Sequence, residues 1–165
     1  MRIFFDTEFT ELGPDPKLIS IGFVSEDGRT FYAELTDTYS IEQVGEFAKE
    51  VVLPLLEGGL ALMSMNDLKL HLADWIKRFE QPVRLATDSL AWDWPWIQKI
   101  FGAPGAWPEN LDGKPLLLTM NYLDQSERFY DAVEKAFSKG LRRHHALDDA
   151  KASRLGWIAA GGDID

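Results

Sequence analysis

The sequence predicts an α/β protein in which a mixed five-stranded sheet is flanked by helices. Two observations support this class. Three apolar, alternating segments follow one another with short joins before residue 36, and from residue 41 onward the apolar spacing switches between helical and strand patterns. The chain has 165 residues and no Pro/Gly/Ser-rich linker divides it, so we expect a single domain over residues 1–165.

The first three elements are predicted to be strands. Residues 2–9 are rich in Ile and Phe, and residues 17–25 alternate between apolar and small or polar side chains. A turn at Glu26-Asp27-Gly28 leads to a third strand at residues 29–35. Because strands joined by short turns pair with their neighbours, we expect an antiparallel meander.

The remaining elements alternate between helix and strand. Apolar residues at helical spacing, together with short buried runs between them, carry this interpretation. We predict helices at residues 41–56, 68–79 and 146–160, a Trp-rich segment ending near residue 102, and strands at residues 82–87 and 115–120. A meander followed by this alternation is the element order of a ribonuclease-H-like fold.

Composition excludes several classes of protein. Hydrophobic residues make up 45% of the chain, too many for a disordered acidic tail, and the absence of cysteine excludes disulfides and thiolate chemistry. A cysteine-free chain fits a reducing compartment, so we expect a cytoplasmic protein, and no apolar run is long enough for a membrane span. The formal net charge of -10 argues against nucleic-acid binding through a basic surface alone.

Two carboxylates interrupt the most hydrophobic strand. Asp6 and Glu8 are two residues apart, so both side chains point to one face of the strand, about 7 Å apart along it. Either they form part of a functional site, or this is an edge strand with two solvated acids. The flanking Ile3, Phe4 and Phe9 make an exposed strand less favourable than it would otherwise be. The residues alone do not decide between the two interpretations.

A second acidic segment follows the predicted strand at residues 82–87. Asp88 and Asp93 alternate here with Trp92, Trp94 and Trp96. Capping of a turn or helix explains one acid, with the tryptophans in the core, but it does not explain an aspartate between two tryptophans.

The third segment places cations and histidines just before the last predicted helix. Arg142, Arg143, His144 and His145 precede acids at positions 148 and 149. Plain helix-end electrostatics explains the acids, and spacing alone favours Asp148 as the partner of His144 on one helix face. With Lys135 and Lys139, the arginines concentrate positive charge in an acidic protein, which suggests an anionic ligand.

In this order, the three segments resemble the DEDDh family of 3′-to-5′ exonucleases, which includes ribonuclease T, oligoribonuclease and proofreading subunits. Asp6-Thr7-Glu8 matches the D-x-E motif, Trp92-Asp93 matches the second motif, and His144 to Asp149 matches H-x4-D. The sequence around Asp93 is most similar to that of a compact bacterial and phage exoribonuclease-like subgroup.

The resemblance implies a metal-dependent mechanism. Four converging carboxylates repel one another, and oxygen ligands without cysteine point to hard divalent ions, Mg²⁺ or Mn²⁺. By resemblance, Asp6 bridges two such ions, Glu8 and Asp149 complete the first, and Asp93 holds the second through water. His144 is then the general base, and the pattern selects Asp149 over Asp148, His144 over His145 and Asp93 over Asp88.

The resemblance also implies a substrate and the residues that bind it. The expected substrate is a single-stranded 3′ end, RNA favoured over DNA, shortened with release of a nucleoside 5′-monophosphate. Phe9, Thr10 and Leu12 are expected to line the pocket of the terminal nucleotide, and Trp92 is a stacking candidate. Arg142 and Arg143 are expected to contact phosphates. Further stacking candidates, for which core packing is favoured, are Trp94, Trp96, Phe129 and Tyr130.

Three alternatives stay open. One is a deoxyribonuclease of the same family, and another is a catalytically silent ribonuclease-H-like binding module. The third is a glycosidase that uses Asp6 and Glu8 as its carboxylate pair, which leaves the third motif unexplained. Members of the family are often homodimers, so a homodimer is also an open expectation.

Overall fold

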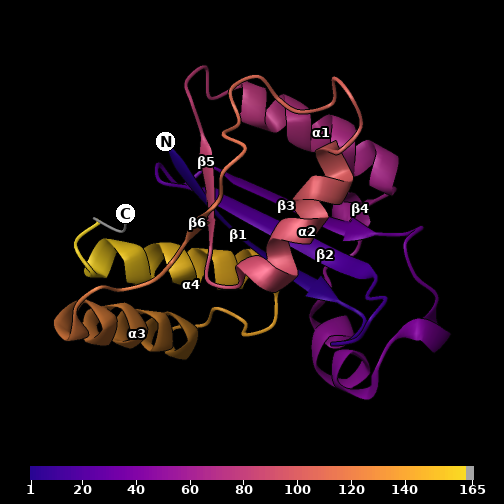
Figure 1. The fold of residues 1–165 in the computed structure, drawn as a ribbon. Helices are drawn as coiled ribbons and strands as arrows, with labels where there is room; N and C mark the ends of the chain where they lie inside the picture. The colour runs from indigo at the N-terminus through magenta and orange to yellow at the C-terminus, as the bar shows by residue number, and fades with distance from the viewer. Residues whose placement is uncertain (163–165) are drawn as a thin grey trace.

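A computed structural model describes residues 1–162 of the chain (Figure 1), so the last three residues of the predicted domain lie outside the described residues. Its centre is a mixed six-stranded sheet in the order β4-β3-β2-β1-β5-β6. The bounds of the strands are β1 Arg2–Phe9, β2 Leu18–Ser25, β3 Thr30–Leu35, β4 Leu62–Met63, β5 Arg84–Thr87 and β6 Leu116–Leu117.

The predicted fold class is confirmed, with one strand more than expected. β1, β2 and β3 form the antiparallel meander, and β5 pairs with β1 in parallel. The additional strand β4 pairs in parallel with the outer edge of β3. It is only two residues long, which is too short for a period-two pattern to show in the sequence.

Helices cover both faces of the sheet (Figure 1). α1 (Met65–Lys77) and α2 (Leu90–Phe101) lie on one face, and α3 (Leu123–Ser138) and α4 (Ala146–Ala159) lie on the other. Phe5 of β1 belongs to the core with the first pair, whereas its neighbour Phe4 belongs to the core with the second pair. No helix among residues 1–162 has the length and apolar character needed to cross a membrane.

α3 is a helix that we did not predict from the sequence. Of its sixteen residues only Phe129 and Ala136 are buried. Its apolar residues Phe129, Val133, Ala136 and Phe137 nevertheless stand at helical spacing, so the periodicity of this segment was sufficient to predict the helix. It packs on α4 at Gly156, where a Cβ would lie 2.8 Å from the ring of Phe129.

The helix predicted over residues 41–56 is wrong as a continuous element. The chain there forms short helical turns, η1 (Ile41–Gln43), η2 (Ala48–Val52) and η3 (Leu53–Leu55). The interruption is at Gly45, whose N–H donates to the Thr10 carbonyl instead of a helical partner. η2 then continues directly into η3, whose first turn accommodates Pro54. We call residues 41–57 the cap segment. Its residues Val44, Ala48 and Val52 pack on Ile19 and hold the segment beside the end of β1.

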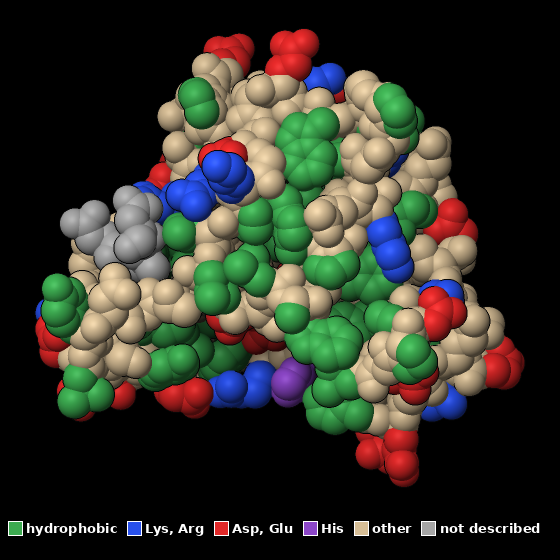
Figure 2. All heavy atoms as spheres, in the orientation of Figure 1, with side chains coloured by type: hydrophobic (Ala, Val, Ile, Leu, Met, Phe, Trp, Pro, Cys, Tyr) green, Lys and Arg blue, Asp and Glu red, His purple; other side chains and the backbone are tan. Residues whose placement is uncertain are grey.

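The surface of the molecule reflects its acidic composition. Figure 2 shows Lys and Arg side chains in small, separate groups on the visible face, with Asp and Glu side chains spread around its outline. This distribution agrees with the formal net charge of -10. Any anionic ligand that binds on this face must therefore be held locally and not by a broad basic surface.

Candidate active site

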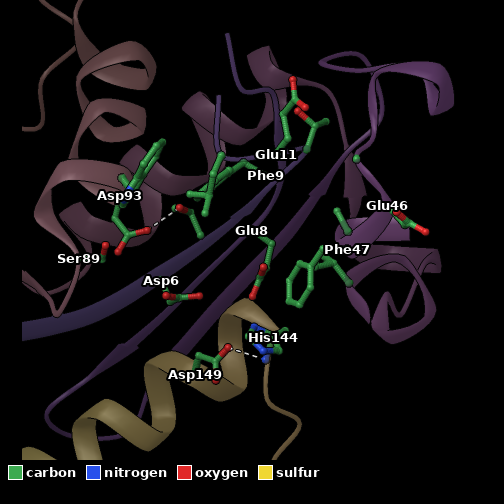
Figure 3. Close-up of a pocket in the computed structure, with 17 residues that line it drawn as sticks. Asp6, Glu8, Phe9, Glu11, Glu46, Phe47, Ser89, Asp93, His144 and Asp149 are labelled. Atoms are coloured by element: carbon green, nitrogen blue, oxygen red, sulfur yellow. Dashed lines mark hydrogen bonds between the residues drawn. The ribbon is translucent and has the colours of Figure 1, made fainter. Parts of the chain in front are cut away.

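A cavity of about 710 Å³ opens where β1 ends, between α2, α4 and the cap segment (Figure 3). All five predicted catalytic residues line it, together with the three predicted substrate-binding residues that follow the first motif. The catalytic candidates are Asp6, Glu8, Asp93, His144 and Asp149. The motifs that are far apart in the sequence therefore meet in one cavity.

The first turn of α4 brings the third motif to β1. His144 precedes the helix with a φ of 65°, a left-handed conformation that is uncommon for a residue with a side chain. Its backbone N–H donates to Asp149 Oδ2 at 2.8 Å, so the same loop orients both residues. Donor atoms of Glu8, His144 and Asp149 all lie within 4.8 Å of one another.

Asp93 reaches the cavity from α2, on the opposite face of the sheet. It is only 2% exposed, and both carboxylate oxygens accept hydrogen bonds from threonine hydroxyls. Thr7 donates to Oδ1 at 2.6 Å, and Thr87 donates to Oδ2. Sequence reasoning missed both threonines, since a threonine in a buried strand has no signature of such a role.

Asp88 joins this group, although the sequence pattern assigned it no role. It follows β5 directly, and the parallel register pairs Phe4 with Ala86, so Asp88 falls beside Asp6 at the sheet edge. Donor atoms of Asp6, Asp88 and Asp93 also lie within 4.8 Å of one another. The site thus contains two adjoining groups of potential ligands.

The electrostatics of the cavity disfavour the ionised form of its carboxyl groups. Burial, followed by repulsion from Asp93, Asp149 and Glu8, raises the pKa of Asp6 well above its usual value. Burial likewise raises the pKa of Glu8 to about 8, of Asp149 to about 7 and of Asp93 to about 6. The pKa of His144 is lowered, first by burial and then by the nearby Arg143 charge, so its ring is neutral near pH 7.

This donor set fits divalent cations. Five carboxyl groups supply its oxygens, which are the ligands that hard ions such as Mg²⁺ and Mn²⁺ prefer, and the imidazole of His144 lies beside them. Carboxylates that are costly to ionise alone become favourable anions once a cation lies between them. The acidic clusters can therefore bind metal.

Four predicted substrate-binding residues line the cavity. Phe9 stacks on Trp92 with ring centroids 5.5 Å apart, and Leu12 is 74% exposed at the rim. Thr10 has a structural task, because its hydroxyl accepts from the Lys17 N–H. Sequence reasoning did not identify Phe47 of the cap segment as a site residue. It is 58% exposed, and its ring meets that of His144 edge-on, with ring centroids 5.1 Å apart.

The structure does not bring Arg142 and Arg143 into the cavity. Arg142 is paired with Asp148 and with Glu57, both at 2.7 Å. Arg143 is paired with Glu134 of α3 at 2.8 Å. The phosphate contacts that we expected of the two arginines stay a prediction. Neither arginine lines the cavity, but the Arg143 charge adds to burial in lowering the pKa of His144 and opposes the burial that raises the pKa of Asp149.

The residues that the third motif left open are structural. His145 is buried and caps α4 by accepting from the Asp148 N–H, and Asp148 is buried between Arg142 and Lys151. The other aromatic candidates lie outside the cavity lining. Trp94 and Trp96 pack on the core beside α1, Phe129 is buried beneath α4, and Tyr130 is on the exposed side of α3.

The fold and the paired acidic groups are those of the DEDD-type superfamily of 3′-5′ exonucleases. Residues 1–159 match the model of the Rv2179c-like 3′-5′ exoribonuclease domain, and the chain belongs to that family.

Two curated relatives from Mycobacterium tuberculosis are named 3′-5′ exoribonucleases, Rv2179c of strain ATCC 25618 / H37Rv and MT2234.1 of strain CDC 1551 / Oshkosh. Each is 37% identical over 99 residues, which cover 59% of this chain and 54% of the relative. The chain therefore spans about half the length of the curated relatives it matches.

A solved structure supports the fold. The Mg²⁺- and Mn²⁺-bound form of S. pombe Pop2p matches with a TM-score of 0.59 and 17% sequence identity, over 99% of this chain and 86% of that one. This match confirms the ribonuclease-H-like fold predicted from the element order.

Proposed function

We propose that the protein is a metal-dependent 3′-5′ exonuclease that removes nucleotides from single-stranded 3′ ends. The observation that carries this proposal is the convergence of Asp6, Glu8, Asp93, His144 and Asp149 in one cavity. Three separate segments of the chain supply these residues, and four of them are carboxylates held against their mutual repulsion. The mutual repulsion of these carboxylates destabilises the fold unless bound cations neutralise their charge.

The two adjoining ligand groups support a site for two divalent ions. Glu8 and Asp149 would hold one ion, and Asp93 and Asp88 the other. Asp6 belongs to the second group, and because the charges of Asp149 and Glu8 raise its pKa, we propose that it would also contact the first ion. When bound, such ions stabilise the charge that develops on a phosphodiester and lower the pKa of a bound water. The threonine hydroxyls fix the orientation of Asp93, as partners of a ligand do in metal sites.

His144 is placed to take a proton. Its side chain lies in the group with Glu8 and Asp149, and its lowered pKa keeps a free lone pair on the ring near neutral pH. Phe47 covers one edge of the ring and restrains it. We assign His144 as the general base toward the attacking water.

The walls of the cavity suit the last nucleotide of a strand. The Phe9–Trp92 pair on one side and Phe47 on the other offer stacking surfaces, which bind bases without reading their sequence. We propose single-stranded RNA as the substrate in preference to DNA, because of the family, and a nucleoside 5′-monophosphate as the product.

Digestion of labelled oligonucleotides tests the proposal. RNA and DNA strands, each with a free or a blocked 3′ end, are incubated with Mn²⁺, with Mg²⁺ or with EDTA, and the products are resolved by length. We expect stepwise shortening of unblocked RNA with Mn²⁺ or Mg²⁺ and none in EDTA. Faster digestion of DNA would contradict the RNA preference, and cleavage of 3′-blocked strands would contradict attack at the 3′ end.

The same assay separates the alternatives. A silent binding module retains RNA without shortening it under any of these conditions. A glycosidase that uses Asp6 and Glu8 hydrolyses glycosides in EDTA and leaves oligonucleotides intact. The geometry favours the nuclease over both, because His144 and Asp149 lie beside Glu8 in the same cavity.

Two further expectations about the whole protein remain part of the proposal. We place it in the cytoplasm, since a chain without cysteine fits a reducing compartment. A homodimer is the oligomeric state that the family suggests. Cell fractionation and the solution mass measured by light scattering test these two statements separately.

A further inference from the structure

A second cavity, of about 410 Å³, lies between α4, the end of α3 and the β2–β3 turn. Three cationic residues line it, Lys139, Lys151 and Arg154, and the rest of its lining is apolar or neutral. Within residues 1–162, no carboxylate residue is part of that lining, although the chain has a formal net charge of -10. A third cavity, by contrast, combines Lys77 with Glu80 and Glu109.

The charges around this second cavity are only partly neutralised. Among the residues that the structure describes, the Lys139 ammonium has no ion pair or side-chain hydrogen bond. The guanidinium of Arg154 donates to the uncharged backbone carbonyl of Glu26, at 2.6 and 3.1 Å. Lys151 lies 3.2 Å from Asp148, whose carboxylate is shared with Arg142. The cavity therefore presents a local surplus of positive charge.

The two cavities are neighbours along the chain. Leu141 lines the second cavity and His144 lines the first, and three residues of extended chain span at most about 11 Å. The lining of the second cavity also includes Lys151, two residues after Asp149 on α4, so these two side chains leave the helix on different sides, about 200° apart. To reach the second cavity, a strand whose 3′ end occupies the first would pass around the start of α4 along residues 141–144.

We infer that the second cavity binds backbone phosphates of the single strand upstream of its 3′ end. Of the cations at residues 135–143, only Lys139 lines this cavity, and Lys151 and Arg154 of α4 join it there. This inference rests on the proposed function, and it gives an acidic protein a localised place to hold an acidic substrate.

Binding measured apart from catalysis tests it. Fluorescence anisotropy in EDTA compares a labelled 12-nucleotide RNA with a labelled dinucleotide, for the wild type, Lys139→Gln and the double variant Lys139→Gln/Arg154→Gln. We expect the double variant to bind the 12-mer about five- to tenfold more weakly at low salt, with dinucleotide affinity unchanged. For each phosphate that a variant no longer binds, the slope of log affinity against log salt should fall by about 0.7.

Controls keep the result interpretable. The charge-matched variant Lys114→Gln/Arg128→Gln removes one lysine and one arginine from exposed positions outside both cavities, and we expect it to bind both RNAs as the wild type does. Thermal melting verifies that the double variant Lys139→Gln/Arg154→Gln is folded. Equally weakened binding in the test and control variants, or an unchanged 12-mer affinity, would overturn the inference. Because this readout needs no turnover, failure of the proposed nuclease activity would be seen separately.

Discussion

Gly22 of β2 lies opposite Asp6 of β1, and the first turn of α4 packs directly against its Cα. A Cβ at this position would overlap the backbone N and Cα of Leu147, and β2 would then hold α4 away from the sheet. The absence of a side chain at residue 22 lets Asp149 reach Asp6 and Glu8 (Figure 3). Close approach of a helix backbone to a strand is one of the tasks that requires glycine.

Gly22→Ala should damage the metal site and the fold together. We expect the free energy of unfolding to fall by about 1–3 kcal/mol, because the methyl group overpacks a helix–sheet contact, and Mn²⁺ binding to weaken as Asp149 is displaced. Urea denaturation and Mn²⁺ titration calorimetry measure the two effects. Gly113→Ala is the control, since among the described residues no atom beyond residues 112–114 lies within 4 Å of its added Cβ. Equal stability of the two variants would show that α4 does not dock on Gly22 this closely.

Asp93 should be essential for metal-dependent activity, and its threonine partners should strengthen metal binding. We expect Asp93→Ala to reduce metal-dependent kcat/KM by at least about 100-fold, because one ligand group loses its buried member. Thr7→Val should weaken Mn²⁺ binding by about 10- to 100-fold, as removal of a ligand's hydrogen-bond partner does, and Thr7→Ser should restore it. Full activity of Asp93→Ala would show that the proposed site is wrong.

Asp88 should contribute to metal binding, although it is not part of the family motif. Asp88→Asn keeps the shape of the side chain and removes one charge from the group with Asp6 and Asp93. We expect Mn²⁺ affinity to fall about tenfold, read by calorimetry or by the paramagnetic signal of free Mn²⁺. Asp131→Asn, on the exposed surface of α3, serves as the charge-matched control. Identical Mn²⁺ affinity for the two variants would remove Asp88 from the ligand set.

The stability of the metal-free protein should fall as the pH rises. Glu8 and Asp149 have pKa values of about 8 and about 7 in the fold, above the values of 4.5 and 3.8 expected for the unfolded chain. A carboxyl group with a raised pKa binds its proton more tightly in the folded state. The stability that it contributes is therefore complete below about pH 4 and disappears as the pH rises through 7 to 8.

Melting temperatures in EDTA between pH 5.5 and 9 measure this fall. With Mn²⁺ present the cations take the place of the protons, so we expect the stabilisation by Mn²⁺ to grow over the same pH range. Asp6→Asn should flatten the curve in EDTA, since it removes a further carboxyl group whose own pKa is raised by burial. A melting temperature in EDTA that is constant or rises between pH 6 and 9 would contradict the raised pKa values.

Local patterns in the sequence were enough for much of the fold. Strand alternation determined that Asp6 and Glu8 share a face, because side-chain direction in a strand depends only on position along it. The meander and the helix at residues 146–160 were likewise predicted within one or two residues. In the cap segment the prediction failed because helical spacing did not anticipate the interruption at Gly45. The missed helix α3, by contrast, does carry helical spacing, at Phe129, Val133 and Ala136, and was within reach of the sequence.

By itself the sequence determined the three motifs, their order, and the chemistry that acids and a histidine in this arrangement can perform. Only the tertiary structure decided which neighbours complete the site. Thr7 and Asp93 are 86 residues apart in the chain, and Arg142 and Glu57 are 85 apart. Such partners are chosen by how helices pack on the two faces of the sheet, which no short-range periodicity encodes. For the same reason, the ion pairs that occupy Arg142 and Arg143, and the cavity that gathers Lys139, Lys151 and Arg154, became visible only in the folded chain.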